Sequence, residues 1–298
     1  MADIVFCTNE KYAQYIPTLL ESIIHNTSET CRFFIVFSSI NEKDKRNITK
    51  TIESSSDKHN VYFVFFDSNA QLKEISATEL KPFRGSFDAY SRLFLPALLK
   101  EYNVTACIYM DIDTVVLKPL DDLIAISQKI KAIGGVLDTV SIDLKLTFAN
   151  DHYINSGMLL MNLPKLRDID FTSRCLNFMA EHAEILQCPD QDAISNALKK
   201  TEIELVEQRF NEYLPSRRNV LNAVILHFTG PQKPWMSSTR WRYKKLCWYH
   251  YYLMNLFKLK GYSNYKKLSD VIFVIMSRLR FFLNLWLSIR KTLGLLKD

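Results

Sequence analysis

The chain alternates short apolar runs, rich in β-branched and aromatic residues, with longer stretches in which apolar residues recur at helical spacing. This alternation is typical of an α/β protein whose mostly parallel sheet is covered by helices. The pattern predicts strands at residues 3–8, 32–38, 61–66, 104–110, 132–137, 154–162 and 224–228.

The intervening stretches have the spacing of helices. They predict helices at residues 12–25, 39–53, 88–100, 165–186 and 191–199, and a short helix that begins at Asp121 and Asp122. We expect Asn41 to open the helix at 39–53 and Pro96 to bend the helix at 88–100. The first three strands and the two helices between them form a βαβαβ unit of the nucleotide-binding type.

Beyond Trp235 the sequence becomes rich in Trp, Tyr, Lys and Arg. From Leu268 onward, apolar residues recur at three- and four-residue steps, which forms one apolar stripe on a helix. Arg278 and Arg280 interrupt the stripe, and each would cost roughly 2.5–3.5 kcal/mol at a bilayer centre. The pattern favours a helix that lies in a membrane surface with its cations reaching water. A helix packed on the body, or in an oligomer contact, is the alternative.

The distribution of charge agrees with this division. The 298-residue chain has a net charge of +6, but residues 240–298 carry 13 Lys or Arg against two Asp, and residues 1–239 carry 25 basic against 30 acidic residues. An acidic body argues against nucleic-acid binding. The six cysteines have no CxxC spacing, and the first residues lack the pattern of a secretory signal. We therefore expect a cytoplasmic protein.

Asp111-Ile112-Asp113 directly follows the strand predicted at 104–110. Alternate side chains of a strand share a face, so the two carboxylates are expected to point together while Ile112 points into the core. Such a pair suits magnesium or manganese, which neutralises a diphosphate leaving group. Solvated acids in a loop are the alternative, but open α/β sheets bind ligands at this edge.

A second polar cluster, containing His227, Gly230 and Lys233, follows the last predicted strand. An imidazole there would be a third metal ligand, glycine lets a ligand approach the backbone, and lysine reaches a phosphate. A purely structural histidine is the alternative.

Further polar residues begin regular elements. Asn155 opens a strand, and Asp190 and Gln191 open a helix, where they are placed to hydrogen-bond sugar hydroxyls. Asp190 serves equally well as a helix cap. Arg92 reaches a phosphate or carboxylate, or faces solvent. The chain lacks the glycine-rich phosphate loops and the hydrolase and zinc-protease motifs.

Together these segments resemble glycosyltransferase family 8, retaining enzymes that include bacterial lipopolysaccharide galactosyl- and glucosyltransferases and glycogenin. The likeness extends from Asp3 to about Trp235. Each of the matching segments is common by itself, but their occurrence together in this order is highly specific. The segments are Ile4-Val5-Phe6-Cys7-Thr8-Asn9, Tyr90-Ser91-Arg92-Leu93, Tyr109-Met110-Asp111-Ile112-Asp113, Asn155-Ser156-Gly157-Met158-Leu159-Leu160-Met161-Asn162, Asp190-Gln191-Asp192 and His227-Phe228-Thr229-Gly230-Pro231-Gln232-Lys233-Pro234-Trp235.

The resemblance implies a GT-A type catalytic domain at residues 1–239 and a basic, aromatic, membrane-associating helical region at 240–298. It also implies roles for individual residues. Manganese, or magnesium in its place, would be bound by Asp111, Asp113 and His227. Uridine would be held by Cys7, Thr8, Asn9 and Tyr12, with Tyr12 stacking on the base, and Ile112 would also contact the donor. The donor sugar would be surrounded by Arg92, Asp138, Asn155, Asp190 and Gln191, and the diphosphate would be contacted by Gly230 and Lys233.

The catalytic residues implied by the resemblance are Gln191, Asp190 and Asp138, with Gln191 near the anomeric carbon. An amide is a poor nucleophile, so front-face departure of the leaving phosphate is favoured over a covalent intermediate. The implied donor is UDP-galactose or UDP-glucose, and the implied acceptor is a glycan or glycolipid of lipopolysaccharide or lipooligosaccharide synthesis. The protein would then be peripheral on the inner face of the cytoplasmic membrane.

The first turn departs from the galactosyltransferase branch, which carries an acid there. This chain has Thr8-Asn9-Glu10-Lys11, closer to the glycogenin pattern. The loops at 72–87 and 143–153 match nothing, so the acceptor and the oligomeric state stay open. The rivals are a transferase acting on a protein- or cell-wall-linked glycan, a catalytically silent membrane-surface protein, and a sugar nucleotidyltransferase. The last requires a glycine-rich loop, and residues 7–12 contain no glycine.

Overall fold

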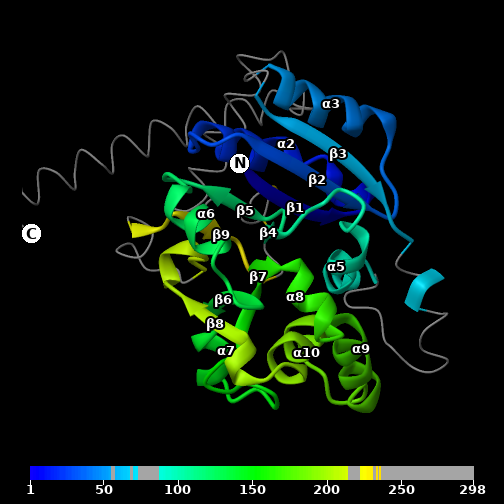
Figure 1. Ribbon diagram of the computed structural model, residues 1–298, viewed down its shortest axis with the longest axis vertical. Helices are drawn as coiled ribbons and strands as arrows, with labels where there is room; N and C mark the ends of the chain where they lie inside the picture. The colour runs from blue at the N-terminus through cyan, green and yellow to red at the C-terminus, as the bar shows by residue number, and fades with distance from the viewer. Residues whose placement is uncertain are drawn as a thin grey trace, which may run out of the picture.

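A seven-stranded sheet forms the centre of the molecule, with helices on both faces (Figure 1). The structure, a computed structural model, describes residues 1–54, 58–67, 70–72, 87–213, 222–230, 233 and 235. In spatial order the strands are β3 (Asn60–Phe65), β2 (Cys31–Phe37), β1 (Ala2–Thr8), β4 (Ala106–Met110), β7 (Ile154–Asn162), β6 (Ile133–Leu137) and β8 (Ile203–Val206).

The strand directions confirm the predicted mostly parallel sheet. Strands β3, β2, β1 and β4 are parallel, β7 is antiparallel to both β4 and β6, and β8 is parallel to β6. Because β7 runs the opposite way, its first residues lie at the same edge as the last residues of its neighbours. Met158 pairs with Met110, and Ile154 pairs with Leu137. Polar residues from three strands therefore meet at this edge.

The helices divide into two layers, one on each face of the sheet. Ile4 and Phe6 of β1 pack toward the first layer, whereas Val5 packs toward the second, because alternate residues of a strand face opposite sides. The first layer contains α2 (Ile16–His25), α3 (Glu42–Glu53) and α6 (Asp121–Ser127). The second contains the 3-10 helix η1 (Asp88–Phe94), α5 (Leu95–Leu98), α8 (Leu163–Asp168), α9 (Phe171–Glu181) and α10 (Pro189–Ala197).

Two prolines change the predicted helices. The helix predicted at 12–25 is broken into α1 (Glu10–Ala13) and α2, and Pro17 lies in the first turn of α2. The stretch at 88–100 begins as a 3-10 helix, and Pro96 lies in the first turn of α5. Proline is favoured there because an N–H in the first turn has no hydrogen-bond partner within the helix, so its absence costs nothing. The prediction that Pro96 bends a continuous helix is therefore wrong.

The helix predicted at 165–186 is also divided, into α8 and α9. Asp170 lies between them with a φ of 50°, a left-handed conformation that interrupts a helix. Five other short elements of the described chain were not predicted: β5 (Thr114–Val116), α7 (Thr139–Asp143), β8, and the 3-10 helices η2 (Lys200–Glu202) and η3 (Gln208–Phe210). Elements of three to five residues are too short for a periodic pattern to be evident.

The strand predicted at 224–228 is β9 (Ile225–His227), which pairs with β5 in a separate antiparallel sheet. Thr114 is opposite His227 in this pairing. The small sheet thus places His227, which lies late in the described chain, close to the end of β4.

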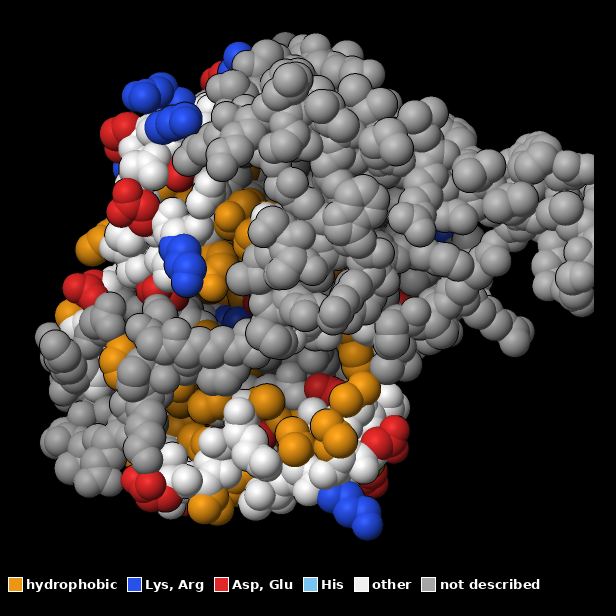
Figure 2. Space-filling view, turned by 180° about the vertical axis from the view of Figure 1, so that it is seen from behind, with side chains coloured by type: hydrophobic (Ala, Val, Ile, Leu, Met, Phe, Trp, Pro, Cys, Tyr) orange, Lys and Arg blue, Asp and Glu red, His pale blue; other side chains and the backbone are white. Residues whose placement is uncertain are grey.

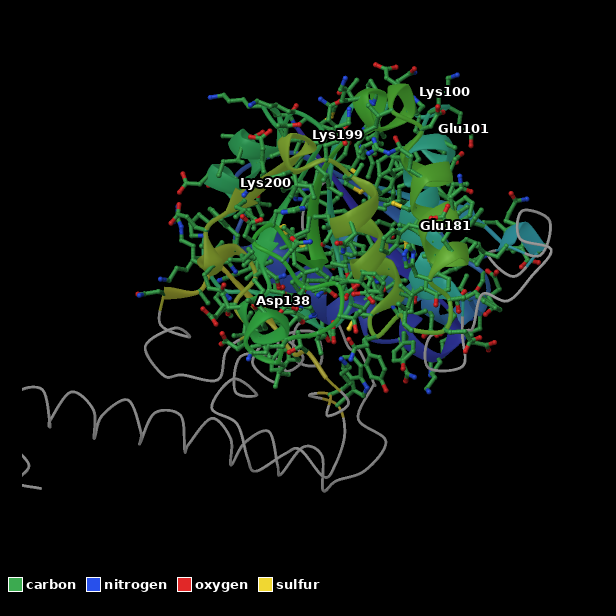
Figure 3. All side chains as sticks on the ribbon, turned by 90° about the horizontal axis from the view of Figure 1, so that it is seen from below. Lys100, Glu101, Asp138, Glu181, Lys199 and Lys200 are labelled. Carbon is green, nitrogen blue, oxygen red and sulfur yellow. The ribbon has the colours of Figure 1, made fainter. Side chains whose placement is uncertain are left out.

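The two ends of the strands lie on opposite sides of the molecule. In Figure 3, Asp138, which follows β6, lies far from Lys100 and Lys199, which precede β4 and β8. On the described part of the face in Figure 2, acidic and basic side chains are interspersed with hydrophobic ones. Asp138 therefore lies at the carboxyl edge of the sheet, away from the edge at which β4 and β8 begin.

Among the described residues, no helix has both the length and the apolar character needed to cross a membrane. The region predicted at 240–298 to associate with membranes, including its apolar stripe, lies outside the described residues.

Candidate active site

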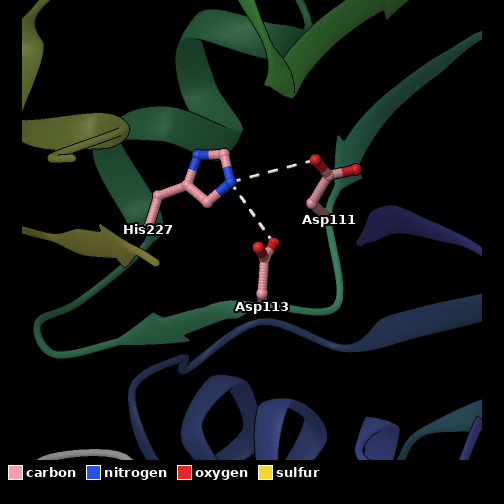
Figure 4. A group of neighbouring side chains, drawn as sticks. All are labelled: Asp111, Asp113 and His227. Carbon is pink, nitrogen blue, oxygen red and sulfur yellow. Dashed lines mark ion pairs between the residues drawn. The ribbon is translucent and has the colours of Figure 1, made fainter. Parts of the chain in front are cut away.

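The carboxylates of Asp111 and Asp113 lie in the turn between β4 and β5 (Figure 4). Strand β4 ends at Met110, so the prediction that strand alternation aligns the two aspartates is wrong. Ile112 nevertheless packs into the core with 8% of its surface exposed. The N–H of Asp111 donates to the carbonyl of Gly157 at 2.8 Å, which fixes the turn to β7.

The carboxylate of Asp111 is held through one of its oxygens. Its Oδ1 accepts hydrogen bonds from the hydroxyl of Tyr109 at 2.6 Å and from Nη2 of Arg92 at 3.0 Å. Burial raises the pKa of Tyr109, so its hydroxyl stays protonated and donates. Oδ2 of Asp111 is left facing His227, 3.8 Å from Nε2.

Asp113 is more deeply buried and is surrounded by cationic and donor groups. Nζ of Lys233 donates to Oδ2 of Asp113 and, at 3.0 Å, to the carbonyl of Phe228. Burial alone would raise the pKa of Asp113, but His227 and Lys233 oppose it and hold the pKa below its ordinary value. The carboxylate is therefore ionised when the site is at neutral pH.

His227 completes the cluster from β9. Its Nε2 lies 3.3 Å from Oδ1 of Asp113, and its Nδ1 lies 2.9 Å from Oδ1 of Asn211. One ligand atom from each of Asp111, Asp113 and His227 lies within 4.8 Å of the other two. Two carboxylates and one imidazole are a donor set that suits a divalent metal ion. The structure thus brings together the three residues predicted to bind the metal.

A pocket opens beside these carboxylates. The predicted residues that line it are Cys7, Thr8, Asn9, Tyr12, Arg92, Asp111, Ile112, Asp113 and Lys233. The pocket lies where the turn after β1 meets the turn after β4, as expected for an open α/β sheet.

The thiol of Cys7 forms an uncharged part of the wall. Burial raises the pKa of Cys7 to about 12, although Arg92 opposes this shift. The thiol therefore remains protonated, and it offers the pocket a neutral surface rather than a nucleophile.

Asp88 and Asn9 form a polar pair in the pocket. Oδ1 of Asn9 accepts the N–H of Lys11 at 3.0 Å, and its Nδ2 donates to Oδ2 of Asp88 at 2.7 Å. Asp88 had no assigned role in the sequence. The turn after β1 carries the amide of Asn9 instead of an acid. Asp88 brings a carboxylate to that turn from another part of the chain.

Tyr12 and Trp235 form another wall of the pocket. Trp235 stacks on Tyr15, with ring centroids 3.9 Å apart and planes at 9°, and meets the edge of Tyr12 at 6.4 Å. The predicted stacking residue is therefore positioned beside a second large aromatic side chain.

A buried hydrogen-bond network adjoins the metal cluster. Oδ2 of Asp138 accepts from Nε2 of Gln191 at 2.9 Å and from Nδ2 of Asn155 at 3.3 Å. Oε1 of Gln191 accepts the N–H of Ser156 at 3.0 Å, and Oδ1 of Asp138 accepts the N–H of Ser141. Three of the residues predicted to surround the sugar thus share one network.

Arg92 joins this network to the metal cluster. It is buried, with 6% of its surface exposed, so the alternative that it faces solvent is wrong. Its Nη1 donates to the carbonyl of Ser156 at 2.7 Å and lies 3.2 Å from Oδ2 of Asp190. Its Nη2 contacts Asp111. One guanidinium therefore connects the two predicted halves of the site.

Asp190 is not the cap of α10, because that position is occupied by Cys188. Its Oδ2 is buried and accepts no hydrogen bond from the described residues, despite the nearby charge of Arg92. Burial raises the pKa of Asp190, and Arg92 opposes that shift. A buried carboxylate oxygen in this state is suited to accept a hydrogen bond from a ligand.

Gly230 has a φ of 85°, which favours glycine, and open space where a side chain would be. It is not among the residues that line the pocket. Its predicted contact with diphosphate stays a prediction.

Replacement of Arg92 by methionine is expected to destabilise the fold. The change leaves the buried carboxylate of Asp190 and the partly exposed carboxylate of Asp111 without their shared cation, which should lower the free energy of unfolding by about 3–5 kcal/mol. Urea denaturation measures this quantity. Arg209→Met is the control, because Arg209 pairs with the exposed Asp122 and its loss should cost about 1 kcal/mol or less. Equal losses in the two variants would contradict this interpretation.

The site therefore combines a cluster of potential metal ligands, a pocket and a polar network at the carboxyl edge of an open α/β sheet, where such folds bind ligands. The model of Glycosyl transferase family 8 matches residues 3–239, and the chain belongs to this family. The resemblance inferred from the sequence is thus confirmed.

Relatives and solved structures agree. The chain is 27% identical to a putative glycosyltransferase of Haemophilus influenzae, over 78% of this chain and 72% of that protein. It is 22% identical to the lipopolysaccharide 1,2-glucosyltransferase of Escherichia coli, over 77% and 73%. The crystal structure of the galactosyltransferase LgtC with donor and acceptor sugar analogs matches with a TM-score of 0.66 and 24% identity, over 82% of this chain and 93% of that chain. The predicted GT-A type fold is confirmed.

Proposed function

We propose that this glycosyltransferase transfers galactose or glucose from a UDP-sugar to a glycan acceptor, in a metal-dependent reaction that retains the anomeric configuration. The observation that carries the proposal is the cluster of Asp111, Asp113 and His227 beside a pocket lined by the turns after β1 and β4. LgtC was crystallised with donor and acceptor sugar analogs, and the Escherichia coli relative is a lipopolysaccharide glucosyltransferase.

Asp111, Asp113 and His227 would hold manganese, with magnesium as the alternative. The bound cation would neutralise the diphosphate of the donor and so stabilise it as a leaving group. The ammonium of Lys233 donates a hydrogen bond to Asp113. It is therefore close enough to the cluster to contact the same diphosphate. Its movement from carboxylate to phosphate would couple donor binding to the cluster.

Uridine would lie between the aromatic wall and the turn after β1. Tyr12 would stack on the base, and Cys7 and Thr8 would supply neutral contacts. The amide of Asn9, fixed by Asp88 and the N–H of Lys11, would be a preorganised polar group in this part of the pocket.

The sugar would contact the network on the other side of the carboxylates. Oδ2 of Asp190 has unused capacity to accept a hydrogen bond from a hydroxyl, and Arg92, Asn155 and Asp138 would complete the site. Both ends of the Gln191 amide are already hydrogen-bonded, to Ser156 and Asp138. This supports an electrostatic role for Gln191 near the anomeric carbon and front-face departure, in preference to a covalent intermediate.

The acceptor is proposed to be membrane-borne, in lipopolysaccharide or lipooligosaccharide synthesis at the inner face of the cytoplasmic membrane. The sequence of residues 240–298 supports this, since its apolar stripe and 13 cationic residues suit an anionic membrane surface. A glycan on protein or cell wall is the alternative acceptor.

Manganese is expected to increase the affinity for UDP at least about tenfold, because the cation bridges the carboxylates and the diphosphate. Calorimetric titration of UDP into the protein, with manganese and with a chelator, measures the difference. A parallel mass-spectrometric assay of UDP-sugars should find one hexose donor whose turnover requires the metal.

UMP is the matched control ligand, because it lacks the second phosphate and should gain less from the metal. A catalytically silent protein of the same fold would bind UDP equally with and without manganese, or not at all. Either result, together with no turnover of any UDP-sugar, would contradict the proposed function.

A further inference from the structure

The side chain of Asn211 connects the metal cluster to the sugar-side network. Asn211 directly follows the 3-10 helix η3 (Gln208–Phe210) and is completely buried. Its Oδ1 lies 2.9 Å from Nδ1 of His227, and its Nδ2 donates to Oδ1 of Asn155 at 2.8 Å. One amide therefore contacts both halves of the site.

Backbone donors determine which way these amides point. The N–H of Gly157 donates to the Asn155 side chain at 3.1 Å, and a backbone N–H can only donate. The atom of Asn155 that receives it must be the oxygen. Because that same oxygen faces Asn211, the Asn211 atom next to it must be the nitrogen. Asn211 consequently presents its oxygen to His227.

The orientation of Asn211 fixes the tautomer of His227. An amide oxygen only accepts, so Nδ1 of His227 must carry a hydrogen. Nε2 is the atom directed at Asp111 and Asp113 (Figure 4), so it holds a hydrogen toward these carboxylates when no metal is bound, and it would offer its lone pair to a metal that displaces this hydrogen. A second hydrogen bond of this kind commonly fixes the ring of a metal-binding histidine.

The same chain of hydrogen bonds continues to Gln191. Nδ2 of Asn155 donates to Oδ2 of Asp138, which also accepts from Gln191. The N–H of Ser156 fixes the Gln191 amide from its other end. His227 and Gln191 are thus linked by one series of buried donors and acceptors, which is oriented by the backbone N–H groups of Ser156 and Gly157 in β7.

We propose that Asn211 is a positioning residue: it fixes His227 in the Nδ1–H tautomer and couples that ring, through Asn155 and Asp138, to Gln191. The purpose of this arrangement rests on the proposed metal site. The tautomer itself does not, because the hydrogen bonds that impose it are made within the protein.

Two variants separate hydrogen bonding from packing. Asn211→Leu keeps a similar volume but removes both hydrogen bonds, whereas Asn211→Asp keeps the acceptor for Nδ1 of His227 and loses the donor to Asn155. Nitrogen NMR of the histidine side chains, in metal-free protein with His227→Gln to assign the signal, reports whether Nδ1 carries a hydrogen, both in the neutral ring and in the ring that is also protonated at Nε2. We expect the Nδ1–H form in the wild type and in Asn211→Asp, and its loss in Asn211→Leu. A wild-type ring with a hydrogen on Nε2 alone, or an unchanged Nδ1–H in Asn211→Leu, would overturn the proposal.

Manganese affinity in the presence of UDP, measured by electron paramagnetic resonance, tests the consequence. Asn211→Leu should weaken manganese binding by about 10–100-fold, the usual effect of removing a residue that orients a metal ligand. Asn211→Asp should bind manganese much as the wild type does but show a lower kcat with little change in KM, because only the link to Asn155 is lost. Equal manganese affinities in the two variants would mean that Asn211 only fills space. Absence of manganese binding in the wild type would refute the proposed function, while the NMR result would still decide the role of Asn211.

Discussion

Asp113→Ala is expected to eliminate the manganese-dependent part of UDP binding and to lower UDP-sugar turnover on the order of 10³-fold, equivalent to about 4 kcal/mol of transition-state stabilisation. The reason is the central place of this carboxylate. Asp113 is 9% exposed, its Oδ1 lies 3.3 Å from Nε2 of His227, and its Oδ2 accepts from Lys233. Its removal takes away one proposed metal ligand. It also takes away the carboxylate that binds the ammonium of Lys233, the group proposed to contact the diphosphate. Release of UDP from a UDP-hexose, with and without manganese, measures the loss.

Two controls make this test specific. Asp113→Asn keeps the shape of the side chain but removes its charge, and a similar loss of turnover would identify the charge as the essential property. Asp121→Ala removes an exposed carboxylate that accepts from Ser28 outside the pocket, and it should leave turnover unchanged. Release of UDP by Asp113→Ala at the wild-type rate would exclude the proposed role of the cluster.

The sheet was predictable because its strands are buried on both faces. Residues such as Ile4, Val5 and Phe6 read as one apolar run, and consecutive residues of that run pack in opposite cores. The short strands β5 and β8 give no such signal. Helix existence was predictable in the same way, but helix limits depend on single residues, such as the left-handed Asp170 between α8 and α9.

The metal cluster was predictable from position in the sheet. The end of β4 carries Asp111 to the carboxyl edge, where open α/β folds bind ligands. The reason given for the alignment of the two aspartates was incorrect, since they lie in a turn rather than on a strand. The outcome was still correct because Ile112 is apolar and packs inward from that turn.

Asn211 was not predictable, because no periodic pattern or motif surrounds it. It reaches His227 through the isolated bridge between Glu212 and Leu226 and the N–H of His227, which donates to the carbonyl of Glu212 at 3.0 Å. Such a contact depends on tertiary structure alone. The linking role of Arg92 was hidden for the same reason, since its partners come from three separate elements.

Gly157→Ala is expected to weaken manganese binding by about 100-fold or more, through displacement of His227. A Cβ at position 157 would lie 2.0 Å from Cε1, 2.7 Å from Nδ1 and 2.9 Å from Nε2 of His227, closer than any real contact allows. The backbone of Gly157 does not have a positive φ, so alanine fits its conformation. The absent side chain therefore serves to make room for the imidazole, and overpacking should lower the free energy of unfolding by about 1–3 kcal/mol.

Gly134→Ala is the matched control, because its Cβ would lie 2.6 Å from the flexible end of Ile130, away from the cluster. It should reduce stability without changing the manganese affinity measured by paramagnetic resonance. A double-mutant cycle then isolates the contact itself. In protein that already carries His227→Ala, no ring remains to be displaced, so Gly157→Ala should reduce neither metal binding nor stability any further. If Gly157→Ala alone binds manganese normally, or if its effects persist without the imidazole, then the space above Gly157 is not what positions His227.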